Sequence, residues 1–221
     1  MSIQLRKQTV QIVLEKKKLQ HVQARVALVI DASGSMRKLY KEGVVQDAVE
    51  RILAVASQFD DDGELDVWVY DNTFSRLPVA TEQTISNYVQ REILENPAIH
   101  KFGRNDEALV MADILEKFLV EQPLTVPSFV IFINDGGCKS TIKKRLITAS
   151  DKPIFWQFVG IGDGNFDFLR KLDDMTGRVV DNANFFHLVA LEETSDAQLY
   201  DALLDEFPEW LREAKAARIL T

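Results

Sequence analysis

The chain has 221 residues, of which 46% are hydrophobic, and its net charge is −8. This length fits one α/β domain with short extensions, and the hydrophobic fraction supplies a sizeable core and argues against disorder. The acidic balance disfavours a nucleic-acid backbone as a partner. A single cysteine, Cys138, excludes an intrachain disulfide and allows a reducing compartment.

Targeting signals are not evident in the sequence. Residues 1–7 lack the apolar segment of a signal peptide. No apolar stretch approaches the roughly 20 residues that a membrane span needs. We therefore expect a cytoplasmic protein without a membrane span.

Two regions differ in pattern. Residues 1–22 are predicted to be an N-terminal extension that packs on the domain, with a short strand-like alternation over residues 9–14. Residues 23–221 are predicted to be a single domain that ends in a helical tail over residues 209–220.

Strand-like and helical segments alternate through the domain. Hydrophobic periodicity predicts strands over residues 25–30, 65–70, 74–79, 128–133, 153–159 and 185–188. It predicts helices over residues 42–58, 84–94, 106–119, 139–148, 166–173 and 196–207, with a polar turn over residues 60–63. The segment 74–79 contains Pro78, which places it at a sheet edge as the return strand of a hairpin. The alternation predicts an α/β fold with a doubly wound, mostly parallel central sheet, helices on both faces and one antiparallel edge strand.

The most informative motif follows the first predicted strand of the domain. Asp31-x-Ser33-x-Ser35 places one carboxylate and two hydroxyls at the C-terminal end of a central strand. In open α/β sheets that edge is where ligands bind. Three small oxygen ligands on a loop that Gly34 allows to turn tightly suit a hard cation such as Mg²⁺. A serine-rich turn with an aspartate cap is the alternative interpretation.

Two further loops are expected at the same edge. Asp135 follows the apolar strand 128–133, where an Asp-Gly turn is the alternative reading. Asn105 and Asp106 precede a helix, and either residue alone would be read as a helix N-cap. Three loops that all offer oxygen ligands at one sheet edge favour a metal site over three independent turns.

Two weaker signals are set aside. The glycine-rich residues 160–164 hint at a dinucleotide loop, but they lie late in the chain and Asn165 stands where a last glycine is needed. Cys138 lies at the proposed site edge, where a cation and a helix start would lower its pKa. An ordinary small loop residue is the favoured interpretation of Cys138, because no His/Asn relay accompanies it.

These motifs resemble a known family. Asp31-x-Ser33-x-Ser35 after one apolar strand, with Asp135-Gly136 after a second, is similar to the von Willebrand factor A domain. Residues 24–31 and 160–169, together with the short segment before the first strand, resemble its bacterial branch associated with tellurium and toxic-cation resistance, the Ter-type proteins. The resemblance implies a Rossmann-like fold with a metal-ion-dependent adhesion site. It also implies a non-enzymatic, divalent-cation-dependent protein-binding module that is part of a stress-resistance system.

The resemblance also implies roles for individual residues. Ser33 and Ser35 would bind Mg²⁺, or Mn²⁺ or Ca²⁺, through their hydroxyls, while Asp31 and Asp135 would act directly or through waters. The chain departs from the family where a threonine is expected, because Asn105 stands there. Coordination by the Asn105 carbonyl oxygen would keep the cation electron-poor and able to accept a carboxylate from a protein partner. Coordination by Asp106 instead would strengthen cation capture and weaken attraction for an acidic partner.

Two other functions are weighed against this one. A strand that ends in Asp31 could belong to a Mg²⁺-dependent phosphatase-like hydrolase in which Asp31 attacks phosphorus. Such enzymes use a second aspartate as acid/base where this chain has Ser33, a poor proton donor at neutral pH. Simple cation sequestration without a partner is the third interpretation.

Overall fold

A single six-stranded sheet organises the chain, with the strand order β3-β2-β1-β4-β5-β6. The computed structural model describes residues 2–59, 63–172 and 174–220. The strands are β1 (Arg25–Asp31), β2 (Asp66–Tyr70), β3 (Phe74–Arg76), β4 (Ser128–Asn134), β5 (Ile154–Ile161) and β6 (Ala183–Leu188). All neighbouring strands pair in parallel except β3, which is antiparallel to β2 at the sheet edge. The predicted fold class is therefore confirmed.

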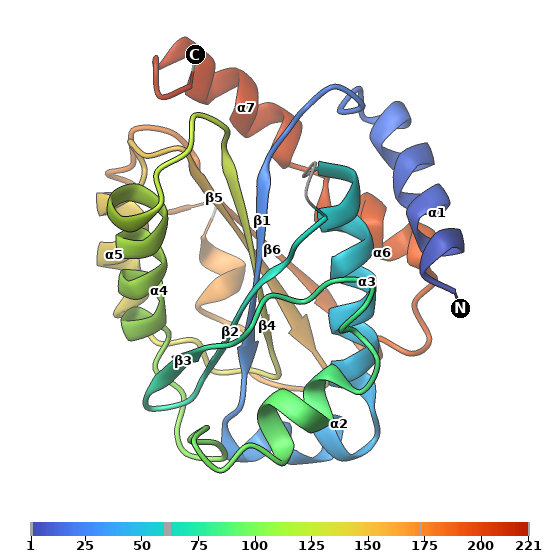
Figure 1. Cartoon of the computed structure of the whole chain (residues 1–221). Helices are drawn as coiled ribbons and strands as arrows, with labels where there is room; N and C mark the ends of the chain where they lie inside the picture. The colour runs from blue at the N-terminus through green and yellow to red at the C-terminus, as the bar shows by residue number, and fades with distance from the viewer. Residues whose placement is uncertain (1, 60–62, 173, 221) are drawn as a thin grey trace.

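Helices connect the strands and cover both faces of the sheet. The α-helices are α1 (Ile3–Lys16), α2 (Arg37–Lys41), α3 (Val44–Phe59), α4 (Glu107–Glu116), α5 (Ile142–Thr148), α6 (Asp196–Leu203) and α7 (Phe207–Ala216). Shorter elements are the 3₁₀ turns η1 (Gly34–Met36) and η4 (Leu169–Lys171) and the π-helical turns η2 (Gln90–Leu94) and η3 (Lys117–Glu121). Figure 1 shows α4 and α5 on one side of the sheet and α1, α3 and α6 on the other.

The alternation of side chains along β1 divides the core into two layers. Val26, Leu28 and Ile30 belong to the cluster that includes α1, α3, α6 and α7. Ala27 and Val29 belong to the cluster formed with α4 and α5. Because both faces are covered, β1 and β4 are almost continuously buried, as a parallel sheet requires.

The N-terminal segment corrects one expectation. Residues 9–14 lie within helix α1, not in a strand. The residues Val10, Val13 and Leu14, at helical spacing, are buried, and the Ser2 side chain accepts a hydrogen bond from the Leu5 amide as an N-cap. Helix α1 packs on α3 and α6.

Two segments predicted to be helices form only short helical turns. Residues 84–94 form turns and then η2, because Asn87 adopts a positive φ of 54° that interrupts helical geometry. Of residues 166–172, only those of η4 are helical. The buried side chains Phe166, Leu169 and Leu172 in and beside this turn are spaced by three, which 3₁₀ geometry satisfies. Residues 60–62 of the predicted polar turn, and residue 173, lie outside the described part of the chain.

Candidate metal centre at the carboxyl edge of the sheet

The predicted site lies where the strand order reverses. Strands β1 and β4 are neighbours, and their crossover connections run to opposite sides of the sheet. Asp31 is the last residue of β1, and Asp135 follows Asn134, the last residue of β4. In doubly wound sheets, the crevice outside this switch point is the usual place of a ligand site.

Hydrogen bonds gather four side chains from the ends of β1 and β4 at this point. The Asp31 Oδ1 atom accepts a hydrogen bond from the Ser33 amide at 2.6 Å, which holds the loop in a tight turn. The Ser33 and Ser35 hydroxyl oxygens lie 3.1 Å apart, and the Ser35 hydroxyl donates to Asp135 Oδ1 at 2.8 Å. The structure thus brings together Asp31, Ser33, Ser35 and Asp135.

The Asp31 carboxylate accepts fewer hydrogen bonds than its two oxygen atoms allow. The residue is 0% exposed, and its Oδ2 atom has no hydrogen-bond partner among the described residues. Burial raises the pKa of Asp31 to about 7, and the negative charges of Asp135 and Glu107 add to this effect. A buried carboxylate oxygen without a partner is costly unless a positive ligand satisfies it, so this donor set fits a divalent cation.

Hydroxyl oxygens are essential to that fit. Within residues 2–59, 63–172 and 174–220, no three His, Cys, Asp or Glu side chains gather into a metal cluster. A cation at this edge would therefore depend on Ser33 and Ser35 in addition to the carboxylates. The two hydroxyls add no charge, so among these four side chains only the carboxylates would offset the charge of a divalent ion.

The third predicted loop is held against the first by backbone contacts. The Gly34 amide donates to the Gly103 carbonyl at 2.9 Å. The Gly103 amide in turn donates to the buried Asp71 carboxylate at 3.0 Å, which also hydrogen-bonds the His100 ring at 2.6 Å. A Cβ atom on Gly103 would lie 2.1 Å from the Asn72 side chain, so a larger residue here would have to displace that side chain.

Asn105 and Asp106 have different surroundings. The Asn105 amide nitrogen donates to the Gly137 carbonyl at 2.8 Å and to the Glu107 carboxylate at 2.9 Å. These two bonds fix the amide group and leave its carbonyl oxygen as the acceptor. The Asp106 carboxylate instead forms an ion pair with Lys139 at 3.3 Å.

The loop after β4 is packed tightly against the glycine-rich segment 160–164. A Cβ atom on Gly164 would lie 1.9 Å from the Asp135 carbonyl oxygen. The Gly137 amide also donates to the Asn165 carbonyl at 2.9 Å. The glycines of this segment therefore allow close backbone packing that positions Asp135.

Cys138 is buried at 8% exposure, beside Glu107. Burial raises the pKa of its thiol, and the negative charge of Glu107 acts in the same direction. The structure therefore supports the ordinary structural role for Cys138 and not the activation that a cation and a helix start would cause.

Two carboxylates near the site were not singled out from the sequence. Asp71 directly follows β2, so its position at the same edge of the sheet was a usable signal. Glu107 is the first residue of α4. It is 0% exposed and accepts hydrogen bonds from Asn105 and from the Lys139 amide. Nothing in its local sequence distinguishes it from a solvated helix-start glutamate.

Solved structures define the class of fold. The proximal thread matrix protein 1 from the mussel byssus superposes with a TM-score of 0.62 at 16% identity, covering 83% of this chain and 48% of that one. Another structure of that protein has a zinc-occupied MIDAS motif, that is, a metal-ion-dependent adhesion site, with a TM-score of 0.56 at 14% identity over 83% of this chain and 46% of that one. An aerotolerance-related membrane protein from Bacteroides fragilis gives a TM-score of 0.56 at 14% identity over 84% of this chain and 99% of its own. The chain spans about half the length of the mussel proteins. These likenesses show the von Willebrand factor A fold.

The sequence comparisons are more specific. The family described as the von Willebrand factor A domain found in the TerF C terminus matches residues 23–220, so the chain belongs to this family. It is also 62% identical, over 219 residues, to the uncharacterized protein YcbR of Bacillus subtilis (strain 168), covering 99% of this chain and 90% of that protein. Among the described residues, no helix has both the length and the apolar character needed to cross a bilayer.

Proposed function

We propose that this chain is a divalent-cation-dependent protein-binding module. The cation, Mg²⁺ or else Mn²⁺ or Ca²⁺, would be held by Ser33 and Ser35, with Asp31 and Asp135 acting directly or through water. The observation that carries the proposal is that hydrogen bonds gather Asp31, Ser33, Ser35 and Asp135 at one point, where the buried Oδ2 atom of Asp31 has no hydrogen-bond partner among the described residues.

Asn105 is the better candidate for the ligand from the third loop. Its amide nitrogen is held by two acceptors, so its carbonyl oxygen is the atom that a cation would use. The Asp106 carboxylate already has Lys139 as its partner. This arrangement keeps the ligand set mostly neutral and favours acceptance of a carboxylate from outside.

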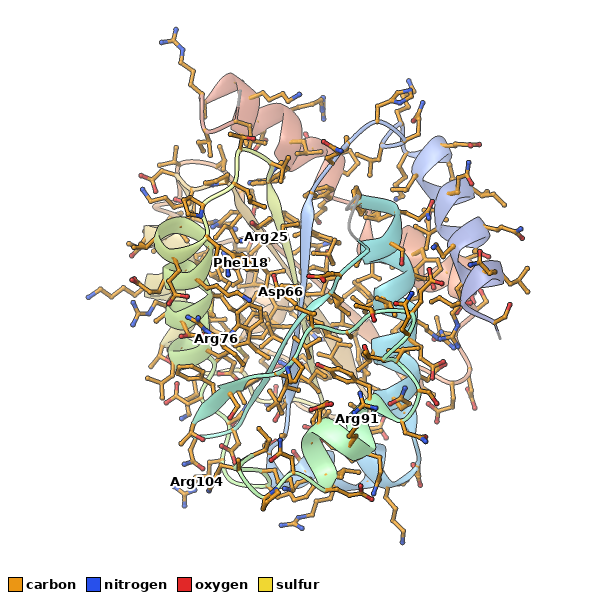
Figure 2. The ribbon with its side chains drawn as sticks, in the orientation of Figure 1. Arg25, Asp66, Arg76, Arg91, Arg104 and Phe118 are labelled. Atoms are coloured by element: carbon orange, nitrogen blue, oxygen red, sulfur yellow. The ribbon has the colours of Figure 1, made fainter. Side chains whose placement is uncertain are left out.

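The surroundings of the site carry charge of both signs. Ser35 and Asp135 line a groove of about 340 Å³, in which Val189 is 70% exposed. The charged side chains that also line this groove are Lys38, Glu42, Asp163 and Glu192. Arg37, Lys41 and Arg104 are exposed around the same edge of the sheet. Figure 2 shows Arg104 extending outward from that edge. A partner could therefore place a single carboxylate on the cation, with acidic flanking residues toward the arginines and Lys41 and neutral or basic ones toward the groove.

The same features argue against catalysis. Asp31 is fully buried, and Ser33 stands where a phosphohydrolase of this type needs an acid/base.

The cytoplasmic location and a place in a tellurium or toxic-cation resistance system are parts of the proposal that rest on family membership. A strain that lacks the encoding gene should then lose tellurite tolerance, and tolerance should return with the natural gene but not with a Ser33→Ala copy.

Calorimetric titration with Mg²⁺ and Mn²⁺ tests the cation site. Ser33→Ala and Ser35→Ala should each weaken binding at least about tenfold, because each removes one ligand from a small set. Ser86→Ala, at an exposed serine remote from the site, is the matched control and should bind as the natural chain does. Equal affinity of all three variants would remove the proposal.

Asn105→Ala and Asp106→Ala separate the two versions of the third ligand. Only the Asn105 variant should weaken cation binding if the amide oxygen is the ligand.

A pull-down from native lysate, with Mg²⁺ or with a chelator, tests the binding of a protein partner. A partner recovered with Mg²⁺, and lost with chelator or with Ser33→Ala, supports it. Tight cation binding with no recovered protein would instead indicate sequestration, and Mg²⁺-dependent turnover of a generic phosphatase substrate that Asp31→Asn abolishes would indicate an enzyme.

A further inference from the structure

A second surface lies on the face of the sheet covered by α4 and α5. Figure 1 shows these two helices next to each other, and they are in direct contact. Between them is an open groove of about 880 Å³, lined by Ala108 at the start of α4 and by one side of α5. None of the residues assigned above to the cation site lines this groove.

The groove combines an apolar surface with unpaired positive charge. Ala108, Ile147 and the methyl group of Thr148 contribute apolar lining. Lys143, Lys144 and Arg145 also line the groove and are exposed. These three side chains have neither an ion pair nor a hydrogen bond within the described ranges. No acidic side chain among the described residues lines the groove, although the chain as a whole has a net charge of −8.

Neighbouring segments also carry exposed apolar side chains, although these do not line the groove. Leu109, which follows Ala108 on α4, is 45% exposed. Val179 is 62% exposed, and its amide donates to the Ser150 side chain just beyond the end of α5. Isolated exposed apolar side chains are ordinary, so only the lining of the groove itself points to a docking site.

We infer that the groove between α4 and α5 is a docking site for an acidic amphipathic segment of another protein. The apolar stripe of such a helix would lie on Ala108 and Ile147, because a groove between two packed helices accepts the ridge of a third. Acidic residues beside that stripe would pair with Lys143, Lys144 and Arg145. This binding would be independent of the cation.

Other occupants fit the groove less well. A second copy of this chain carries a net charge of −8, which opposes self-association. A nucleic acid would find no aromatic side chain for base stacking among the described lining residues. A lipid bilayer is broad and flat and would not fill a concave groove between two helices.

Fluorescence anisotropy with a synthetic peptide tests the inference. The probe is a labelled peptide of about 18 residues, long enough to form a helix, with leucines at helical spacing and glutamates beside them. A second probe has lysines in place of the glutamates. The full chain should bind the acidic probe at least about tenfold more tightly than the basic one, and binding should weaken with added salt.

Three variants assign the binding to the groove. Lys143→Glu/Lys144→Glu/Arg145→Glu should weaken binding of the acidic probe at least about tenfold. Arg212→Glu/Lys215→Glu/Arg218→Glu makes the same charge change on exposed residues of α7 and its C-terminal end, and should bind as the natural chain does. Thr148→Glu adds one acid to the groove without touching a buried side chain, and should weaken binding severalfold even if the triple variant folds poorly.

The cation site provides a separate check. Chelator and Ser33→Ala should leave binding of the acidic probe unchanged, so a failure of the proposed function does not affect this test. Equal binding of the two peptides, or equal loss in the α5 and α7 triple variants, would overturn the inference. Tighter groove-dependent binding of anionic lipid vesicles or of a single-stranded oligonucleotide would also overturn it, as would a dimer in light scattering that the α5 variant abolishes.

Discussion

Asp31→Asn is the substitution that best separates what the buried Asp31 carboxylate costs the cation-free fold from what it contributes to cation binding. In the folded chain without a cation, burial raises the pKa of Asp31 to about 7, whereas an unperturbed aspartate has a pKa near 3.8. Folding therefore favours the protonated carboxyl group. This contribution to stability is fully present below about pH 3.8 and is lost as the pH rises through about 7.

The magnitude follows from these two pKa values. A difference of about 3 corresponds to about 4 kcal/mol, because one pKa unit is worth about 1.36 kcal/mol. Only part of this change in the free energy of unfolding falls within the pH range of the experiment. Between about pH 5.5 and 8.5, the free energy of unfolding should fall by about 2 kcal/mol in the presence of chelator. The raised pKa values of Asp135 and Glu107 act in the same direction.

Asp31→Asn removes the titrating group but keeps an oxygen that can accept the Ser33 amide. In chelator at about pH 8.5, the variant should be more stable than the natural chain, and the fall in its stability across this pH range should be reduced. Saturating Mg²⁺ should stabilise the natural chain by about 2.7 kcal/mol at 100 times its dissociation constant and should leave the variant unchanged. Because the cation needs the ionised carboxylate, the Mg²⁺ affinity of the natural chain should rise with pH through about 7.

Urea unfolding at two pH values, with Mg²⁺ or with chelator, measures all of these quantities. Asp151→Asn, at an exposed aspartate beside Lys152, is the matched control and should follow the natural chain. If Asp31→Asn is less stable than the natural chain at about pH 8.5 in chelator, the reasoning from burial is refuted. The same holds if the stability of the natural chain does not change between the two pH values.

Three further predictions concern other parts of the molecule. Gly164→Ala should weaken Mg²⁺ affinity at least about tenfold in calorimetry, because the added Cβ would lie 1.9 Å from the Asp135 carbonyl oxygen. Gly43→Ala, at a positive φ without such a contact, should lose only about 1 kcal/mol of stability and keep its affinity. Arg6→Ala should cost about 3 kcal/mol in urea unfolding, because it leaves the buried Asp196 with one cationic partner fewer, whereas Lys16→Ala at an exposed pair should cost under about 1 kcal/mol. Equal losses in the Arg6 and Lys16 variants would contradict this account of the α1 contact. The Cys138 thiol should react with iodoacetamide at neutral pH far more slowly in the folded chain than in urea, and equal rates would contradict its burial.

The parallel sheet and the edge that carries the site could be predicted from local patterns. The continuous apolar runs of β1 and β4 are typical of strands covered on both faces, and helical segments between them require parallel crossovers. The motif from Asp31 to Ser35 lies directly after the first of these strands, so its position at the carboxyl edge follows from sequence order. The strand predicted over residues 9–14 is wrong because alternation over six residues also fits a helix whose apolar positions are spaced by three and four.

Which oxygen atoms meet was decided only by the tertiary structure. The hydrogen bond between Ser35 and Asp135 joins residues 100 positions apart, and nothing in either segment specifies their distance. The different environments of Asn105 and Asp106 likewise depend on Gly137 and Lys139, which the packing of β4 against β1 brings near. Sequence by itself determined the chemistry available at the edge, because residue types and strand order are local properties. Tertiary packing decided which groups are buried, paired or left to a cation, because burial and charge pairing depend on every element that surrounds them.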